Sequence, residues 1–432
     1  MPRVAIVGGG WAGLAAAVEL AAHGMPVVLC EAARQLGGRA RAVAWDGVSV
    51  DNGQHLLIGA YRETLRLAQR VGSADRLRRR RLRLILPEFE LGLPRLAAPL
   101  HLATGLLTAR GLGLGDKLAA TRFMQALKRQ AFRLAADTTV DALLRQHAQP
   151  QTLIDRLWAP ICVAALNTPL EQASARVFCN VLRDSLGAHR ADSDFLFHQG
   201  PLAALLPEPA ARYIASHGGE VRLGCKVEGI RQSAGGWRLL GPEIEAQAVV
   251  VATHPARLPA LLGGLPALGP ILDKVRDYRW QPIDTTWLRF AAPVRLPYPM
   301  LALGGGQSPW VFDRQDLVPG LLSVVVSAEG PHLDADGPTW SEHLIERLQP
   351  LIGPLPRLLG HKRIIEKRAT YACVPSMHRP ANRTPLSGLY LAGDYTRGDY
   401  PATLEGAVRS GVACARMITG VDRVLITNQE HR

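Results

Sequence analysis

Lysine is scarce in this chain. Only six of the 432 residues are lysine, so arginine carries most of the positive charge behind the formal net charge of +13. A basic protein can contact nucleic acid, anionic lipid or acidic substrates. The sequence contains no zinc finger, aromatic RNA-binding signature or other nucleic-acid motif, so we expect no nucleic-acid partner and favour a membrane surface.

Paired cysteines, spanning segments and a leader are also lacking. The six cysteines are scattered without a C-x-x-C pair, which predicts free thiols in a reducing compartment and no metal site. No uninterrupted apolar run reaches the roughly 18 residues of a membrane-spanning helix. Because the chain enters its first predicted strand directly after Arg3, no room is left for a signal peptide. We expect a cytoplasmic protein whose contact with the inner face of the cell membrane, if it has one, is peripheral.

A glycine-rich turn follows the first predicted strand. The apolar run Val4–Val7 predicts a buried parallel strand, and the Ala- and Leu-rich segment Ala12–His23 predicts a helix. Gly8 and Gly10 lie between the strand and the helix, and Gly13 lies at the start of the helix, which gives the pattern G-x-G-x-x-G. We expect Gly8 to permit the tight turn, Gly10 to let the backbone approach a pyrophosphate, and Gly13 to let the helix pack closely. This arrangement is typical of a dinucleotide site.

The next segments add charged groups to that site. Pro26–Cys30 predicts the second strand, and Glu31 closes it, where a carboxylate accepts hydrogen bonds from the ribose hydroxyls of adenosine. Paired glycines followed by arginine come next. We expect Gly38 to allow close backbone approach and Arg39 to make a charge-assisted contact with the pyrophosphate. Val227 stands where such domains use a backbone edge to hold adenine.

The C-terminal part of the chain carries a second cofactor motif. A short strand is predicted at Leu389–Leu391, followed by Gly393 and Asp394, whose carboxylate we expect to face ribityl hydroxyls. Thr403 and Leu404 open the last predicted helix, whose N-terminal dipole can stabilise negative charge on a reduced flavin. The two ends together predict that the cofactor is FAD and that the chain folds back so that both ends share one domain.

The length of the chain predicts two domains, because 432 residues exceed what a single core usually organises. The expected fold class is α/β: a Rossmann-type FAD-binding domain with a discontinuous α+β substrate domain, made of a mixed sheet plus helices. The FAD-binding domain is expected to comprise residues 1–75, 205–262 and 371–420, and the substrate domain residues 76–204 and 263–370.

Two polar clusters are candidates for catalysis. Asp51 and His55 follow the predicted strand Val48–Val50, and Asp399 and Tyr400 precede the last helix. Asp51 or Asp399 is the candidate acid, supported by His55, which titrates in the useful range, or by Tyr400. A purely structural alternative stays open, in which Asp51 makes a turn and His55 packs or caps.

An apolar, proline-broken stretch gives a candidate membrane surface. Leu84–Gly115 is rich in leucine and is bracketed by the arginine-rich run Arg76–Arg83 and by Arg110 with Lys117. Apolar surface ringed by cations is how a monotopic protein sits on anionic lipid. The alternative is that this stretch forms the core of the substrate domain and that the arginines lie on a solvated strand.

Several segments together resemble a known family. DNGQHLLIGAY (51–61), ATYACVPSMHRP (369–380) and YLAGDYTRGDYPATLEGAVRSG (390–411) are similar to hydroxysqualene dehydroxylases, within the amine oxidase/phytoene desaturase superfamily of flavoproteins. The resemblance spans nearly the whole chain. It implies FAD-dependent reduction of hydroxysqualene, a long-chain isoprenoid, to squalene with loss of water, in hopanoid or related triterpenoid synthesis. Squalene-synthase-like enzymes are then candidate partners.

Two other functions stay open. A carotenoid- or phytoene-type desaturase would run hydride transfer in the opposite direction. A non-catalytic prenyl-chain binding protein could use the same fold, although the set of Glu31, Arg39 and Asp394 favours a bound flavin.

Overall fold

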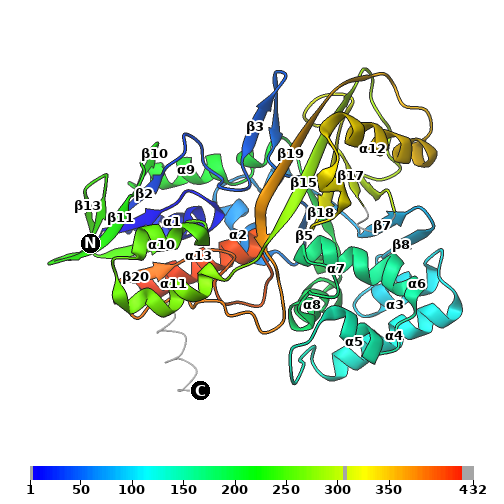
Figure 1. Ribbon diagram of the computed structural model, residues 1–432, viewed down its shortest axis with the longest axis horizontal. Coiled ribbons are helices and arrows are strands. Elements are labelled where there is room, and N and C mark those ends of the chain that lie inside the picture. The colour runs from blue at the N-terminus through cyan, green and yellow to red at the C-terminus, as the bar shows by residue number, and fades with distance from the viewer. Residues whose placement is uncertain (1–2, 305–308, 421–432) are drawn as a thin grey trace.

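The computed structural model describes residues 3–304 and 309–420. Figure 1 shows two lobes that the long strands β15 (Trp280–Phe290) and β19 (Leu358–Tyr371) connect. We call the lobe that contains the first strand and the last helix the cofactor lobe, and the other the distal lobe.

A parallel five-stranded sheet forms the centre of the cofactor lobe. Its strand order is β10-β2-β1-β14-β20. The strands are rich in valine and leucine and are largely buried, as expected for a parallel sheet covered on both faces. Their bounds are β1 Val4–Val7, β2 Val27–Glu31, β10 Glu220–Leu223, β14 Ala248–Val251 and β20 Leu389–Leu391. β1 and β20 therefore bring opposite ends of the chain into one sheet, as the two motifs predicted.

The first and last helices pack directly against each other in this lobe. α1 (Trp11–Ala22) contacts α13 (Leu404–Thr419), and a Cβ at Gly411 would overlap the carbonyl oxygen of Ala12. The lobe also contains α2 (Arg62–Arg70), α9 (Pro207–Ser216), α10 (Leu258–Leu262) and a small antiparallel sheet of β11 Gly229–Ser233, β12 Gly236–Leu240 and β13 Ile244–Ala246.

An antiparallel sheet forms the distal lobe, in the order β16-β17-β18-β15-β19. One side of it packs on α12 (Gly337–Ile352) through a separate apolar cluster that includes Leu288, Leu344 and Leu348. The remaining strands are β16 Met300–Ala302, β17 Trp310–Asp313 and β18 Leu321–Ser327.

Helices of residues 100–187 lie beside this sheet, as Figure 1 shows. They are α3 Leu100–Thr108, α4 Leu114–Arg129, α5 Val140–Gln146, α6 Gln151–Leu153, α7 Ala159–Leu166 and α8 Ala175–Leu182, with π-helical turns at Ile154–Trp158 and Arg183–Gly187. Short strands complete the lobe boundary: β3 Ala42–Trp45, β4 Val48–Asp51, β5 Leu57–Ile58, β6 Leu77–Arg80, β7 Arg83–Leu86, β8 Phe89–Gly92 and β9 Phe195–His198.

One helix ends earlier than its sequence indicates. The basic segment 119–136 predicts a single helix, but α4 ends at Arg129, because Ala131 and Phe132 adopt positive φ and Phe132 turns into the core. α11 (Gly269–Arg276) contacts the turn Pro255–Arg257 of the cofactor lobe, and the chain then enters the distal sheet at β15.

The cysteines are free, as expected, and five of the six are buried. Within the described residues, no helix combines the length and the apolar character needed to cross a bilayer.

Candidate active site

A single large cavity of about 1320 Å³ is lined by both lobes. Glycines and charged side chains of the cofactor lobe form one part of its wall, including Gly8, Gly10, Glu31, Gly38, Arg39, Gly393 and Asp394. Apolar side chains form another part, including Leu82, Leu84, Ile161, Met300, Trp310 and Phe312. The cavity thus joins a polar cradle to an apolar wall in one continuous space.

The three glycines of the first motif have different structural roles. Gly8 has φ +112°, and a Cβ there would stand 2.6 Å from the carbonyl oxygen of Ala252. A Cβ at Gly13 would overlap the carbonyl oxygen of Gly8. Gly10 differs, because a Cβ there would meet only the Cα of Gly38, at 4.0 Å, and Gly10 lines the cavity. Gly8 and Gly13 are therefore needed by the fold itself, whereas the missing side chain of Gly10 leaves the backbone open to a ligand.

Glu31 ends β2 at the same cavity wall. Its carboxylate accepts hydrogen bonds from the backbone N–H groups of Gly9 (2.6 Å) and Ala33 (2.8 Å), which fix its orientation. Val227 lines the same cavity and is 8% exposed. The structure therefore brings together the two residues that we expected to hold the adenosine end of the cofactor.

Arg39 and Asp394 join the two sequence motifs directly. Two hydrogen bonds, of 2.7 and 2.8 Å, run from one guanidinium nitrogen of Arg39 to the two carboxylate oxygens of Asp394. Arg39 also donates to the carbonyl oxygen of Ala369 at 2.6 Å. Burial opposes the charge of Arg39, but the Asp394 carboxylate outweighs it and raises the pKa of Arg39. A fixed positive charge therefore lies on the cavity wall.

The last helix begins at the cavity. Thr403 caps it, because its hydroxyl oxygen accepts a hydrogen bond from the N–H of Gly406 at 3.1 Å. Thr403 and Leu404 both line the cavity, so the positive end of the helix dipole lies at its wall. This geometry suits an anionic or electron-rich group.

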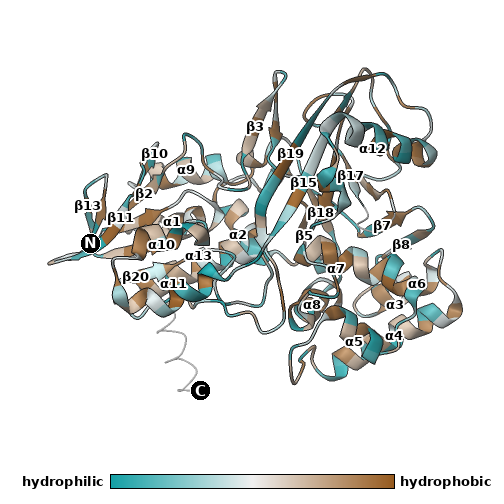
Figure 2. Ribbon diagram, viewed as in Figure 1, coloured by the Kyte–Doolittle hydropathy of each residue, from teal (hydrophilic) through white to brown (hydrophobic). Residues whose placement is uncertain are grey.

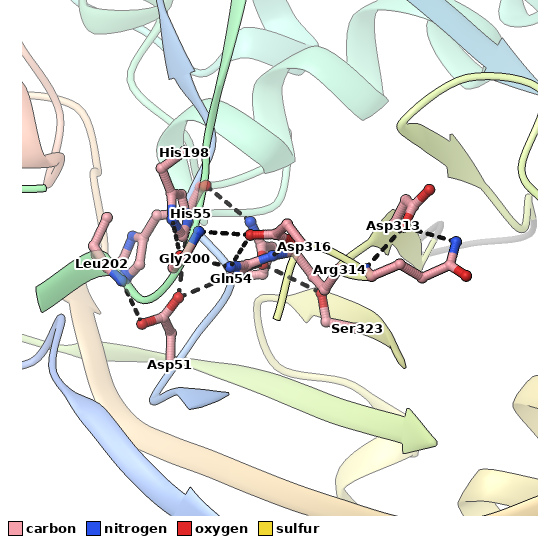
Figure 3. A network of polar contacts seen from close by, with 11 residues as sticks. Asp51, Gln54, His55, His198, Gly200, Leu202, Asp313, Arg314, Asp316 and Ser323 are labelled. Carbon is pink, nitrogen blue, oxygen red and sulfur yellow. Dashed lines mark hydrogen bonds and ion pairs between the residues drawn. The ribbon is translucent and has the colours of Figure 1, made fainter. Parts of the chain in front are cut away.

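The candidate acid Asp51 lies in a buried polar network rather than on the cavity wall. Figure 3 shows its carboxylate between His198, Leu202 and Arg314. It accepts from the N–H of Leu202 at 2.8 Å and from Arg314 at 3.3 Å, and lies 3.7 Å from the ring of His198. Burial raises the pKa of Asp51, although Arg314 opposes that effect.

The same network holds two side chains that do face the cavity. Arg314 donates to the side-chain oxygen of Gln54 at 2.7 Å, and the Gln54 amide donates to the carbonyl oxygen of His55 at 3.0 Å. Gln54 and His55 both line the cavity. Burial, with the charge of Arg39, lowers the pKa of His55 to about 4, so this imidazole is neutral at neutral pH. Asp51 thus contacts the cavity through Arg314 and Gln54.

The second candidate pair is divided in the same way. The side chain of Asp399 is 65% exposed and pairs with Arg183 at 3.2 Å, away from the cavity lining. Tyr400 lines the cavity and is 8% exposed. Burial raises the pKa of Tyr400, while the guanidinium of Arg409, 4.4 Å from the ring centroid, opposes the effect.

Two acidic residues of the cavity wall were not anticipated from the sequence. Asp184 lies on the π-helical turn Arg183–Gly187, and its carboxyl interacts with the hydroxyl of Tyr400. Glu366 accepts a hydrogen bond from the Asn52 amide at 3.1 Å. No sequence pattern marks either residue, because a π-helical turn and a strand pairing far along the chain bring them to the wall.

The residues present fit a dinucleotide with an isoalloxazine ring. The open backbone at Gly10, the anchored carboxylate of Glu31 and the helix start at Thr403 lie on one cavity. Each offers the group that the corresponding part of FAD needs: phosphate, ribose and flavin.

Comparison with known proteins gives consistent matches. The model of the flavin containing amine oxidoreductase family matches residues 11–419. A hydroxysqualene dehydroxylase from Rhodopseudomonas palustris is 31% identical over 441 residues, covering 97% of this chain and 99% of that protein. A 15-cis-phytoene desaturase from Glycine max is 26% identical, covering 100% of this chain and 81% of that protein. A solved putrescine oxidase has a TM-score of 0.73 at 16% identity, covering 97% and 99% of the two chains.

These matches confirm four expectations from the sequence: the resemblance itself, the α/β flavoprotein fold, the FAD cofactor and the activity of an FAD-dependent oxidoreductase. An enzyme is thereby favoured over the non-catalytic alternative.

Proposed function

From the premise that this chain belongs to the flavin containing amine oxidoreductase family, we propose that it reduces hydroxysqualene to squalene, in hopanoid or related triterpenoid synthesis. The observation that carries the proposal is the likeness, along nearly the whole chain, to a hydroxysqualene dehydroxylase. The cavity supports it, because its polar cradle continues into an apolar wall that suits a hydrocarbon chain.

The reaction removes a hydroxyl group as water and replaces it with hydrogen. The carbon–oxygen bond breaks as the hydroxyl takes up a proton, and a carbon–hydrogen bond then forms. FAD, when bound in its reduced form, supplies the hydride and is oxidised. The protein must donate the proton, hold the isoprenoid in place and keep other water away.

The cavity wall offers Tyr400 as the proton donor. The Tyr400 hydroxyl is protonated at neutral pH, because burial raises its pKa, and the guanidinium of Arg409 opposes that rise and keeps the hydroxyl more acidic than burial alone would leave it. Loss of that proton would leave a phenolate, which the guanidinium of Arg409 can stabilise, because one of its nitrogens lies 3.3 Å from the hydroxyl oxygen. Asp184 lies on the same cavity wall, where its carboxylate adds negative charge near Tyr400 and Arg409. The neutral imidazole of His55 also lines this wall and carries one N–H that a ligand could accept from.

Asp51 and Asp399 enter the proposal as positioning residues. Asp51 holds Arg314, which holds the cavity-lining amide of Gln54. Asp399 holds Arg183, a partner of Asp184, through a carboxylate that faces solvent.

We propose that the reaction takes place in the cytoplasm, because the six free cysteines suit a reducing compartment. The isoprenoid is then supplied through peripheral contact with the inner face of the cell membrane, or by a squalene-synthase-like partner.

Product analysis tests the proposal. The enzyme, reduced chemically under anaerobic conditions and mixed with detergent-dispersed hydroxysqualene, is expected to form squalene and oxidised flavin in equal amounts. The oxidised enzyme, under the same conditions, is the control and should form none. Flavin that stays reduced in the presence of hydroxysqualene would contradict the proposal.

A phytoene-type desaturase is the second candidate, favoured by the likeness to the Glycine max protein. It predicts the opposite result: oxidised enzyme is reduced by a polyene precursor, and reduced enzyme leaves hydroxysqualene unchanged.

A further inference from the structure

Exposed leucines gather in one short part of the chain. Among the described residues, seven large hydrophobic side chains are exposed, and five of them fall within residues 96–118. These five leucines, which we call the leucine face, are Leu96 (40% exposed), Leu100 (58%), Leu107 (65%), Leu114 (80%) and Leu118 (49%). The other two, Leu223 and Leu359, are isolated on β10 and β19.

The leucine face follows from the way α3 packs. Leu102 and Leu106 turn inward and are buried, whereas Leu100 and Leu107, seven positions apart, lie on the opposite side of the helix. Figure 2 colours much of α3 brown, the hydrophobic end of the scale, and Leu100 and Leu107 of this helix are nonetheless exposed. α3 is therefore apolar on both its inner and its outer side, which is unusual for a helix that faces water.

The start of α4 continues the same pattern and then changes to charge. Leu114, Leu118 and Arg122 follow one another at intervals of four residues, so they share one side of the helix. Arg95, Arg110 and Arg122 are exposed, and within the described residues no ion pair involves any of them. Lys117 donates to the carbonyl oxygen of Leu107 at 2.7 Å, at the junction of the two helices. Apolar side chains with unpaired cations beside them match an anionic, apolar-centred surface.

Some arginines of the run Arg76–Arg83, which we expected to contact lipid, form ion pairs within the protein. Arg79 pairs with Asp194 at 3.3 Å, and Arg83 pairs with Glu90 at 2.8 Å. The half of residues 84–115 that forms β7 and β8 is core, because Leu84, Phe89 and Leu91 are buried. The β7–β8 half of the stretch is therefore buried, and only the leucine face is left as a candidate membrane surface.

The inner side of the leucine face packs on a core that reaches the cavity. α3 contacts β8, which pairs with β7, and Leu84 of β7 lines the cavity. The inward residues Leu102 and Leu106 belong to the same hydrophobic cluster as Leu84.

We propose that the leucine face, with Arg95, Arg110 and Arg122, docks on the surface of an anionic lipid bilayer. The leucines enter the interface between headgroups and acyl chains, and the arginines contact the anionic headgroups. The docking does not depend on the reaction. The biological purpose of the docking does rest on the proposed function. Docking would bring the enzyme to the bilayer, in which its isoprenoid substrate dissolves.

Vesicle co-sedimentation tests the docking directly. The probe is vesicles of phosphatidylglycerol and phosphatidylcholine in equal parts, mixed with the purified flavoprotein at low salt. The double variant Leu107→Ser/Leu114→Ser is expected to bind at least about tenfold more weakly than the parent. The control Leu223→Ser/Leu359→Ser removes two other exposed leucines (48% and 50% exposed), which lie outside the leucine face, and should bind as the parent does. Replacing Arg95, Arg110 and Arg122 by Gln should weaken binding to these vesicles and reduce its dependence on salt.

Three results would overturn the docking proposal. The first is absence of binding of the parent to anionic vesicles at low salt. The second is equal loss of binding in both double variants. The third is a parent protein that is dimeric in sedimentation velocity, becomes monomeric in Leu107→Ser/Leu114→Ser and does not bind vesicles, which would assign the face to a second copy of the chain.

Turnover of detergent-dispersed hydroxysqualene separates this proposal from the proposed function. This turnover should be unchanged in Leu107→Ser/Leu114→Ser, because both leucines are largely exposed and neither lines the cavity. Lack of turnover in the parent, with vesicle binding intact, would reject the reaction and leave the docking surface standing.

Discussion

Replacement of Gly10 by valine should remove the flavin while leaving the fold intact. Gly10 has φ −75° and ψ 178°, a backbone conformation that valine adopts readily. An added Cβ would meet only the Cα of Gly38, at 4.0 Å, which is an ordinary van der Waals distance. We therefore expect the free energy of unfolding of the flavin-free protein to change by no more than about 0.5 kcal/mol, as for a surface substitution.

The effect on cofactor affinity should be far larger. The new side chain would project into the cavity, at the point where the backbone of the glycine-rich turn is open. If it prevents two backbone N–H groups from reaching phosphate, two charge-assisted hydrogen bonds of about 1.5–3 kcal/mol each are lost. Their sum, about 3–6 kcal/mol, corresponds to a decrease in FAD affinity of roughly 10²–10⁴-fold.

Fluorescence titration of the flavin-free protein with FAD measures the affinity, and thermal unfolding of the same sample measures the fold. Gly264→Val is the matched control, because a Cβ there meets nothing within 4 Å and Gly264 does not line the cavity. Gly13→Val should instead fail to fold, since its Cβ would overlap the carbonyl oxygen of Gly8. Parental FAD affinity in a folded Gly10→Val protein would refute the assignment of this turn to the pyrophosphate.

Three further predictions concern the cavity wall. Tyr400→Phe should lower kcat by about 10²–10⁴-fold at unchanged flavin content. The control Asp399→Asn should lower kcat less than about tenfold. Equal turnover of Tyr400→Phe and the parent would exclude Tyr400 as the proton donor. Asp394→Asn should destabilise the flavin-free protein by about 1–3 kcal/mol in urea unfolding, because Arg39, which is 31% exposed, loses its charged partner, and addition of Arg39→Gln should recover part of that loss. His55, whose pKa falls from its ordinary 6.5 to about 4, binds a proton more readily in the unfolded chain, so stability should fall as pH falls through this window. Urea midpoints of His55→Gln between these pH values should show a shallower slope, and an unchanged slope would contradict a buried, neutral His55.

The parts of the fold that were predictable depend on local sequence. β1 and β20 lie at the bounds that their apolar runs indicated, because a run buried on both faces is typical of a strand in a covered parallel sheet. The end of α4 was not predictable, since it depends on the packing of Phe132 into a core whose other residues are distant in sequence.

The candidate acids show why the site was harder to predict than the fold. Asp51 is the last residue of β4 and the chain bends directly after it, so Asp51 and Asn52 point in different directions. The sequence marked the strand end as polar, but it contained no information on which face the cavity would occupy. In the structure Asn52 lines the cavity and Asp51 does not. Asp184 has no local signature either, because its place on the wall depends on a π-helical turn.

The contact between Arg39 and Asp394 explains why the cofactor site belongs to neither end of the chain alone. The two residues are 355 positions apart, and their hydrogen bonds form only when β20 has joined the sheet that β1 begins. The contact of α1 with α13 is a second link between the two ends of the chain. It is made through Gly411 of α13, which lies against the backbone of α1. A ligand that spans the wall from Gly10 to Thr403 binds only this closed arrangement, so its binding free energy adds to the stability of the closed chain. The flavin therefore acts on the fold as well as on the substrate, because it holds together the two ends that create its site.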